Sequence, residues 1–87
     1  MRELVFMPLA WKQLAWWLEN DIKMVKKIYK ILDNILRTPF DGLGQPEPLK
    51  LNYSGYWSRR INQEHRIVYK VEDEQIIVHS ILGHYQN

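Results

Sequence analysis

The spacing of hydrophobic residues changes along the chain, and each change predicts a different element. Residues 4–6 form a short apolar run that stops before Pro8, which is typical of a buried strand followed by a helix with proline in its first turn. Trp16 falls on the side of this helix opposite its apolar face, where an exposed tryptophan is typical of a partner contact. The apolar residues that recur at helical spacing are Trp11, Leu14, Ala15 and Leu18.

A second, strongly amphipathic helix is predicted next, capped by Asn20 or Asp21. With about two residues between them, the two helices are expected to form an antiparallel hairpin. The charged face of the second helix either contacts RNA or a ribosomal surface or is simply solvated. Its apolar face is formed by Ile22, Val25, Ile28, Tyr29, Leu32, Ile35 and Leu36. Its charged face is formed by Lys23, Lys26, Lys27, Lys30, Asp33 and Arg37.

Proline and glycine then interrupt the pattern between residues 39 and 48 and predict a rigid, irregular loop. Beyond it the alternation of apolar and polar residues predicts β-strands around residues 50–53, 57–61, 66–71 and 75–82. These elements predict an α+β fold, with the N-terminal strand and the helical hairpin packed on a twisted antiparallel sheet.

The composition fits one small domain over residues 1–87, because 46% of the 87 residues are hydrophobic and no second core has room to form. The chain has no cysteine, and its histidines at 65, 79 and 84 lack metal-ligand spacing, so we expect neither a metal nor a cofactor. The apolar runs are short and interrupted by charge, so we expect no signal peptide, no membrane contact and a cytoplasmic protein.

The net charge of +2 conceals an asymmetry between segments. Residues 50–70 carry five Lys or Arg and one Asp or Glu, whereas residues 71–87 carry no Lys or Arg and three Asp or Glu. A cationic cluster of this kind on a small domain favours a polyanion such as RNA, although a solvated sheet face has the same composition.

The chemistry-bearing residues of this region suit cleavage of RNA without a metal, because RNA contains its own nucleophile. Such an enzyme must deprotonate a 2′-hydroxyl, stabilise the pentacoordinate phosphorus and protonate the leaving 5′-oxygen. Glu47 suits the base, since Pro46 and Pro48 restrict its backbone beside the cationic cluster. The alternative is a surface salt bridge between Glu47 and Lys50 or an arginine.

The arginines of the cluster provide planar, bidentate donors for a phosphate group. Arg66 and Arg60 alternate with core residues along their strands and are expected on the open face of the sheet. Arg59 falls on the core face of its strand, so its side chain must either extend past the core to solvent or lie where the strand twists outward. The alternative for each is an ion pair with Glu64 or with the acidic turn at 72–74.

The end of the chain contains a candidate general acid. His84 has an imidazole whose protonation can be tuned near phosphate, and Tyr85 has a ring on which an unpaired base can stack. The alternative is a frayed tail. His65 and His79 are interpreted as structural.

Four motifs in the second half of the chain occur in one order. They are P-x-P-L-K around Glu47, S-G-x-W-S-R-R-I over residues 54–61, E-H-R-I-V-Y over residues 64–69, and the pair His84-Tyr85. Together they resemble the YoeB (Txe-type) toxins of the RelE/ParE toxin superfamily, and the resemblance extends over nearly the whole chain from residue 26 onward. It implies a RelE-like microbial ribonuclease toxin fold.

The resemblance also implies roles for individual residues. It assigns catalysis to Glu47, Arg66, His84 and Tyr85. It assigns positive charge for binding RNA to Lys50, Arg59 and Arg60. One departure affects the chain end, because Leu82-Gly83 stand where the family pattern has an arginine and an aromatic residue.

By this resemblance the chain is expected to be the toxin of a type II toxin–antitoxin system, a ribosome-dependent, metal-independent mRNA endonuclease. Its expected partners are the bacterial ribosome, mRNA and a cognate, YefM/Axe-like antitoxin, with a homodimer or a toxin–antitoxin hetero-oligomer as possible assemblies. Two alternatives remain open: a non-enzymatic toxin of the same fold that resembles the ParE gyrase poisons, and an RNA-binding module without chemistry.

Overall fold

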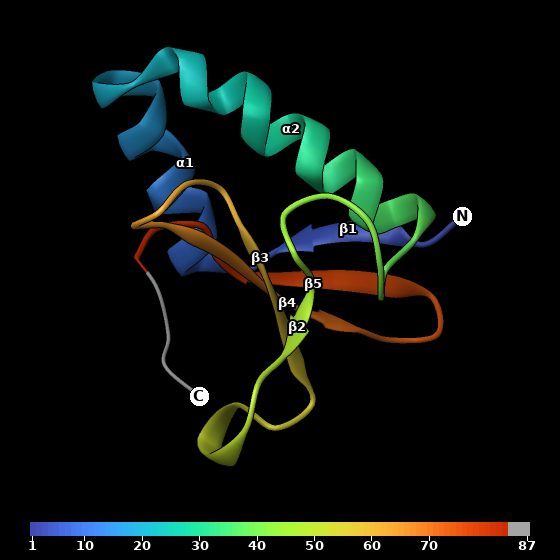
Figure 1. Ribbon diagram of the computed structural model, residues 1–87. Coiled ribbons are helices and arrows are strands. Elements are labelled where there is room, and N and C mark those ends of the chain that lie inside the picture. The colour runs from blue at the N-terminus through green and yellow to red at the C-terminus, as the bar shows by residue number, and fades with distance from the viewer. Residues whose placement is uncertain (84–87) are drawn as a thin grey trace.

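The structure is a computed structural model, and it describes residues 1–83. Within this range two α-helices lie on one side of a five-stranded sheet (Figure 1). The elements in chain order are β1 (Glu3–Phe6), α1 (Pro8–Asn20), α2 (Ile22–Arg37), β2 (Glu47–Pro48), the short 3-10 helix η1 (Leu51–Tyr53), β3 (Tyr56–Arg60), β4 (Arg66–Val71) and β5 (Gln75–Ser80).

The strands follow the order β1-β5-β4-β3-β2 across the sheet. Strands β2, β3, β4 and β5 pair with one another in antiparallel fashion, as predicted, and the α+β class is confirmed. The sheet is nevertheless mixed, because β1 pairs with β5 in parallel, with Glu3 opposite Gln75. An alternation of side chains along one edge strand does not encode its direction, so the sequence pattern alone did not predict this pairing.

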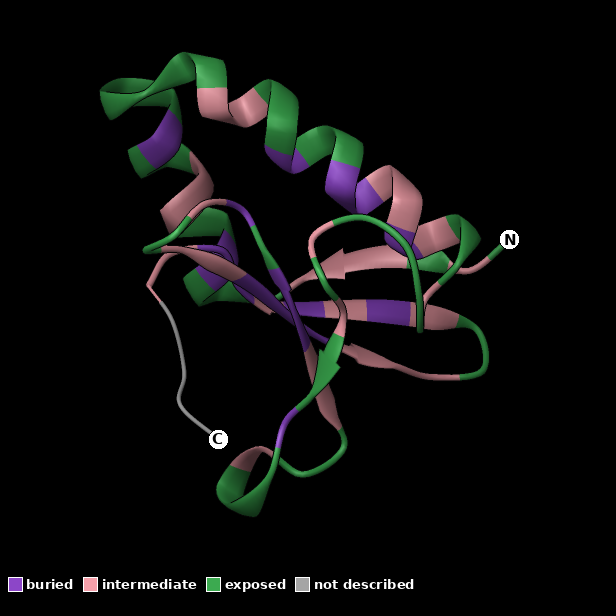
Figure 2. Cartoon of the chain, viewed as in Figure 1, coloured by how far each residue is buried: buried purple, intermediate pink, exposed green. Residues whose placement is uncertain are grey.

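The hydrophobic core lies between the helices and the sheet, and the buried side of α2 faces the strands (Figure 2). The predicted apolar face of α1 was partly wrong, because Trp11 is 65% exposed and Leu18 is 47% exposed. Trp17 is buried instead, and its indole Nε1 donates a hydrogen bond to the Ile81 carbonyl at 2.8 Å. This hydrogen bond satisfies the indole N–H of a tryptophan that enters the core.

The segment predicted as a strand at residues 50–53 is the 3-10 helix η1 instead. Leu51 has a φ of +56°, a left-handed conformation that interrupts a strand. Pairing with β3 therefore occurs earlier, at Glu47 and Pro48, and Leu49 is buried and donates its N–H to the Tyr56 carbonyl at 2.9 Å.

Arg59 on β3 is completely buried, and its guanidinium donates hydrogen bonds to four neutral acceptors. Two of these belong to the end of α2 and the residue after it, one to the following loop and one to β4. They are Asn34 Oδ1 at 2.5 Å, the Thr38 carbonyl at 2.5 Å, the Leu43 carbonyl at 3.1 Å and the Tyr69 hydroxyl at 3.0 Å. The hydrogen bonds of one side chain therefore join four separate segments.

The loop after α2 is held by the same group of residues. The Tyr69 hydroxyl donates to the Pro39 carbonyl at 2.8 Å, and Asn34 Oδ1 accepts the Leu43 N–H at 3.0 Å. Gly44 has a φ of +79°, and a Cβ there would lie 2.8 Å from the Arg60 carbonyl oxygen. A glycine is therefore required where the loop crosses β3 on its way to Glu47.

Replacing Arg59 with methionine should lower the free energy of unfolding by about 3 kcal/mol, because four buried or half-buried acceptors lose a charged donor. Urea unfolding followed by tryptophan fluorescence measures the difference. Replacing the exposed Arg60 with methionine is the matched control, and it should change stability by less than about 0.5 kcal/mol. Equal losses for the two variants would contradict a structural role confined to Arg59.

Tyr69 should make stability depend on alkaline pH. Burial raises the pKa of its hydroxyl, while the hydrogen bond and the positive charge of Arg59 oppose this rise. The unfolded chain therefore releases this proton first, so the contribution of Tyr69 is fully present below about pH 10 and is lost as pH rises through the folded-state pKa. Tyr69→Phe should be less stable by about 1–2 kcal/mol at pH 7.

The measurement is the free energy of unfolding from pH 8 to 11, and the difference between wild type and Tyr69→Phe should shrink above about pH 10. A constant difference across this range would show that ionisation of Tyr69 is not coupled to folding.

Candidate functional site

The face of the sheet away from the helices carries the residues that the sequence singled out. Register places Glu47 opposite Ser58 on the adjacent strand, and Arg60 opposite Arg66. Side chains of directly paired residues share a face, and this pair alternates with core residues such as Ile67. Glu47, Arg60 and Arg66 therefore lie on the same face, over three neighbouring strands. We call it the open face because Glu47 and Arg60 are exposed on it, although Ser58 and Val68, which lie between Glu47 and Arg66, are buried.

Glu47 lies on β2 at the edge of the sheet and is exposed. It is two strands away from β4, where Val68 lies in line with it, and Arg66 lies two residues before Val68. The backbones of Glu47 and Arg66 are therefore separated by roughly 12 Å, from two strand spacings across the sheet and two residues along β4. Side chains of this length reach a common group placed between them. The arrangement brings together a carboxylate able to accept a proton and two guanidiniums able to bind phosphate.

The remaining cations divide into two kinds. Lys50 and Arg60 are exposed, as their expected contact with RNA requires. Arg59 is not available to RNA, because its side chain is buried and already donates hydrogen bonds to four acceptors in the protein. The expectation that Arg59 binds RNA directly is therefore corrected to a structural role, and its core parity on β3 is the physical reason.

A group of aromatic rings beside Glu47 was not predicted. The ring of His79 lies 5.6 Å from that of Tyr56 and 6.2 Å from that of Tyr53, and Lys70 Nζ lies 5.8 Å from the Tyr56 ring centroid. The register shifts between Val68 and Tyr69, and this bulge adds a residue to β5 at His79. Alternation of residue types does not reveal a bulge, so the sequence offered no signal for this position.

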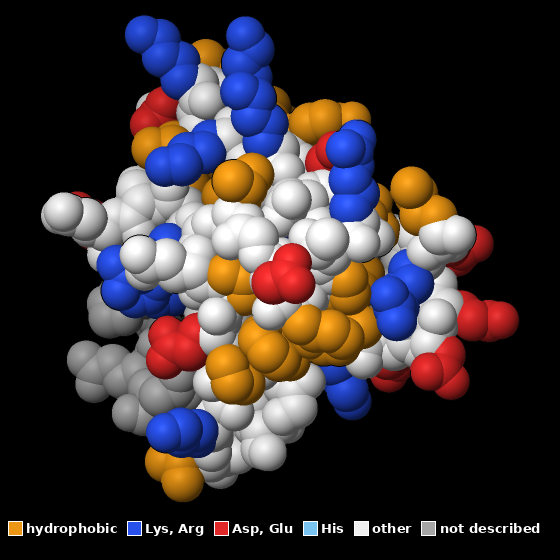
Figure 3. All heavy atoms as spheres, turned by 45° about the vertical axis from the view of Figure 1, so that its right-hand side comes forward, with side chains coloured by type: hydrophobic (Ala, Val, Ile, Leu, Met, Phe, Trp, Pro, Cys, Tyr) orange, Lys and Arg blue, Asp and Glu red, His pale blue; other side chains and the backbone are white. Residues whose placement is uncertain are grey.

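A groove of about 550 Å³ opens between α2 and the loops that flank β3. Three cationic residues line it: Lys27, Lys30 and Arg60. Figure 3 shows Lys and Arg side chains along the top of the molecule, where α2 lies. Part of the lysine stripe on α2 is therefore continuous with the cationic end of β3.

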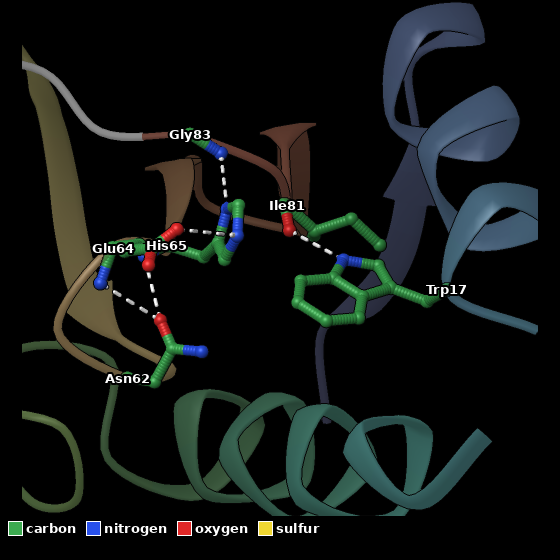
Figure 4. A network of polar contacts seen from close by, with 6 residues as sticks. All are labelled: Trp17, Asn62, Glu64, His65, Ile81 and Gly83. Carbon is green, nitrogen blue, oxygen red and sulfur yellow. Dashed lines mark hydrogen bonds and ion pairs between the residues drawn. The ribbon is translucent and has the colours of Figure 1, made fainter. Parts of the chain in front are cut away.

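Behind the open face, a network of polar contacts holds the end of the described chain (Figure 4). The Gly83 N–H donates to His65 Nδ1 at 2.8 Å, and the Gly83 carbonyl accepts the Arg66 N–H at 2.7 Å. The ring of His65 packs edge-on against Trp17, with centroids 5.0 Å apart. The interpretation of His65 as structural agrees with these contacts.

His84 and Tyr85, the expected acid and its aromatic neighbour, lie outside the described residues. Within residues 1–83 no group of three acidic or histidine side chains is arranged to hold a metal ion. In the same part of the chain, neither helix has the length and apolar character needed to cross a membrane.

Comparison with known proteins gives a consistent result. The family model for the YoeB-like toxin of bacterial type II toxin–antitoxin systems matches residues 6–85. Toxin YoeB of Synechocystis is 49% identical over 84 residues, which cover 97% of this chain and 98% of the relative.

Two solved structures from Staphylococcus aureus share the fold. A YoeB dimer superposes with a TM-score of 0.89 at 46% identity, covering 97% of this chain and 98% of that one. A YoeB–YefM complex superposes with a TM-score of 0.87 at 44% identity, covering 98% of this chain and 99% of that one. In sequence and in fold, this chain therefore belongs to the YoeB-like toxins of bacterial type II toxin–antitoxin systems.

Proposed function

We propose that the chain is a metal-independent endoribonuclease that cleaves mRNA on the bacterial ribosome. The observation that supports the proposal is that Glu47, Arg60 and Arg66 lie on one face of the sheet, so a carboxylate and two guanidiniums project from the same side. Arg66 also binds the Gly83 carbonyl through its own N–H, so the peptide leading to His84 begins beside it.

In the proposed reaction Glu47 accepts the proton of the 2′-hydroxyl, and the 2′-oxygen attacks the adjacent phosphorus. Arg66, with Arg60 opposite it on β3, stabilises the charge of the pentacoordinate phosphorus, because donors held in place are most effective where charge develops. Lys50, exposed three residues after Glu47, adds positive charge for binding RNA. The bond from phosphorus to the 5′-oxygen then breaks. His84 protonates that oxygen, and the products are a 2′,3′-cyclic phosphate and a 5′-hydroxyl.

Tyr85 is proposed to complete the site by stacking on a base or binding a phosphate oxygen. The chemistry uses only groups of the protein and the RNA. No cofactor enters the proposed steps.

The alternatives account for less of the structure. A gyrase poison of the ParE type has no use for a carboxylate beside two arginines, and that branch generally lacks the set of residues present here. A binding module without chemistry would use the cations and the aromatic rings but not Glu47.

An antitoxin is the proposed inhibitor of this site. The Staphylococcus aureus relative is found in a complex with YefM and also as a dimer. An acidic and apolar segment of a similar partner would bury the open face and neutralise Arg60 and Arg66, folding as it binds.

Glu47→Gln should reduce cleavage of ribosome-bound mRNA by a factor on the order of a hundred or more, because it keeps the shape of the side chain and removes the base. Ribosome affinity should stay near normal. Primer extension on a defined mRNA measures the rate, and Glu19→Gln, an exposed change on α1, is the matched control. Full activity of Glu47→Gln would exclude this carboxylate from the mechanism.

The groove beside α2 should contribute to binding rRNA or mRNA through phosphate contacts. Changing Lys27 and Lys30 to glutamine should lower the slope of log affinity against log salt by about 1–2, because each contact releases counterions. Changing Lys23 and Lys26, exposed on the same helix but outside the groove lining, is the control with equal charge loss. Equal slopes for the two double variants would assign the lysines to a solvated face.

A further inference from the structure

The last described residue, Gly83, is held more firmly than a residue near a chain end usually is. Its N–H donates to His65 Nδ1 at 2.8 Å, and its carbonyl accepts the Arg66 N–H at 2.7 Å. Both bonds lead to consecutive residues at the start of β4. Because a peptide group is planar, fixing the Gly83 carbonyl also fixes the orientation of the bond to residue 84.

The residues before Gly83 are anchored as well. Ile81 is buried, its N–H donates to Gln13 Oε1 at 2.7 Å, and its carbonyl accepts the Trp17 indole N–H at 2.8 Å. Two residues of α1 therefore hold the chain just before His65 and Arg66 bind it. Figure 4 shows Gly83 above the His65 ring and Ile81 beside the ring, on the side of Trp17.

The imidazole of His65 is itself fixed from several sides. Its backbone N–H donates to Asn62 Oδ1 at 2.8 Å, and its ring packs against Trp17 and, at 6.4 Å, against Trp16. Its side chain is only 20% exposed. Since Nδ1 accepts the Gly83 N–H, the ring carries its proton on Nε2, which lies 3.8 Å from the exposed Glu64 carboxylate.

We propose that His65 is a positioning residue for the general acid of the reaction. Its Nδ1 holds Gly83, whose carbonyl also binds the N–H of Arg66, the residue proposed to bind the scissile phosphate. His65 thereby fixes the point from which the chain continues to His84. The inference rests on the proposed nuclease function. It extends that function by tying the placement of the acid to a histidine that takes no part in proton transfer.

Two substitutions separate the hydrogen bond from the packing of the ring. His65→Phe keeps a ring against Trp17 and removes the acceptor. His65→Asn removes the ring and places an amide oxygen at the same number of bonds from Cβ as Nδ1. If the hydrogen bond positions the acid, the phenylalanine variant is slow, by a factor on the order of ten to a hundred, and the asparagine variant is close to wild type.

The test compares two substrates under single-turnover conditions on the ribosome, one with the natural 5′-oxygen at the cleavage site and one with a bridging 5′-sulfur. A thiolate leaves phosphorus with its electron pair and needs no proton, so cleavage of the sulfur substrate does not depend on the acid. The ratio of the oxygen rate to the sulfur rate, measured on one protein sample, is also independent of the folded fraction.

We expect this ratio to fall on the order of tenfold or more in His65→Phe and to stay near wild type in His65→Asn. Glu47→Gln should slow both substrates, because the base acts in both. A wild-type ratio in His65→Phe, or an equal fall in both variants, would overturn the inference and leave the nuclease proposal intact. Failure of the wild type to cleave either substrate would contradict both this inference and the nuclease proposal.

Discussion

The buried guanidinium of Arg59 is the interaction on which the rest of the molecule depends. It joins the end of α2, the loop that follows, β3 and β4 through four hydrogen bonds. A buried charge without partners is costly, so breaking these hydrogen bonds is unfavourable, and the loop is held in place at Thr38 and Leu43. That loop leads directly into β2, and Arg59 thereby determines where Glu47 meets the sheet.

The open face is built mainly from backbone register. Glu47, Arg60 and Arg66 lie on three adjacent strands, so their relative positions follow from the pairing of those strands. Placing such residues on paired strands gives more accurate geometry than placing them on separate loops. The exception is the chain end, where Gly83 is bound by His65 and Arg66 and leads to the proposed acid.

The sequence predicted the helices, the last three strands and the face on which Arg60 and Arg66 lie, because these features depend on local periodicity. It predicted that Trp16 is exposed but not that Trp17 is buried, and it left two positions open for Arg59. The alternation of residues along β3 did not decide whether Arg59 is buried, because its burial depends on acceptors 10–25 residues away in sequence. The bulge at His79 and the parallel pairing of β1 were not predicted for the same reason, because each depends on a strand that is distant in sequence.

The two prolines beside Glu47 have a further consequence for how the protein behaves at high concentration. Strand β2 is an edge of the sheet, and edges with free N–H groups invite other chains to pair with them. The Leu49 N–H points inward to Tyr56, so the nitrogen of Pro48 points outward, where proline has no hydrogen to donate. The prolines that restrain the candidate base therefore also prevent other chains from pairing with this edge of the sheet. Replacing them for mechanistic studies would lower solubility as well as activity.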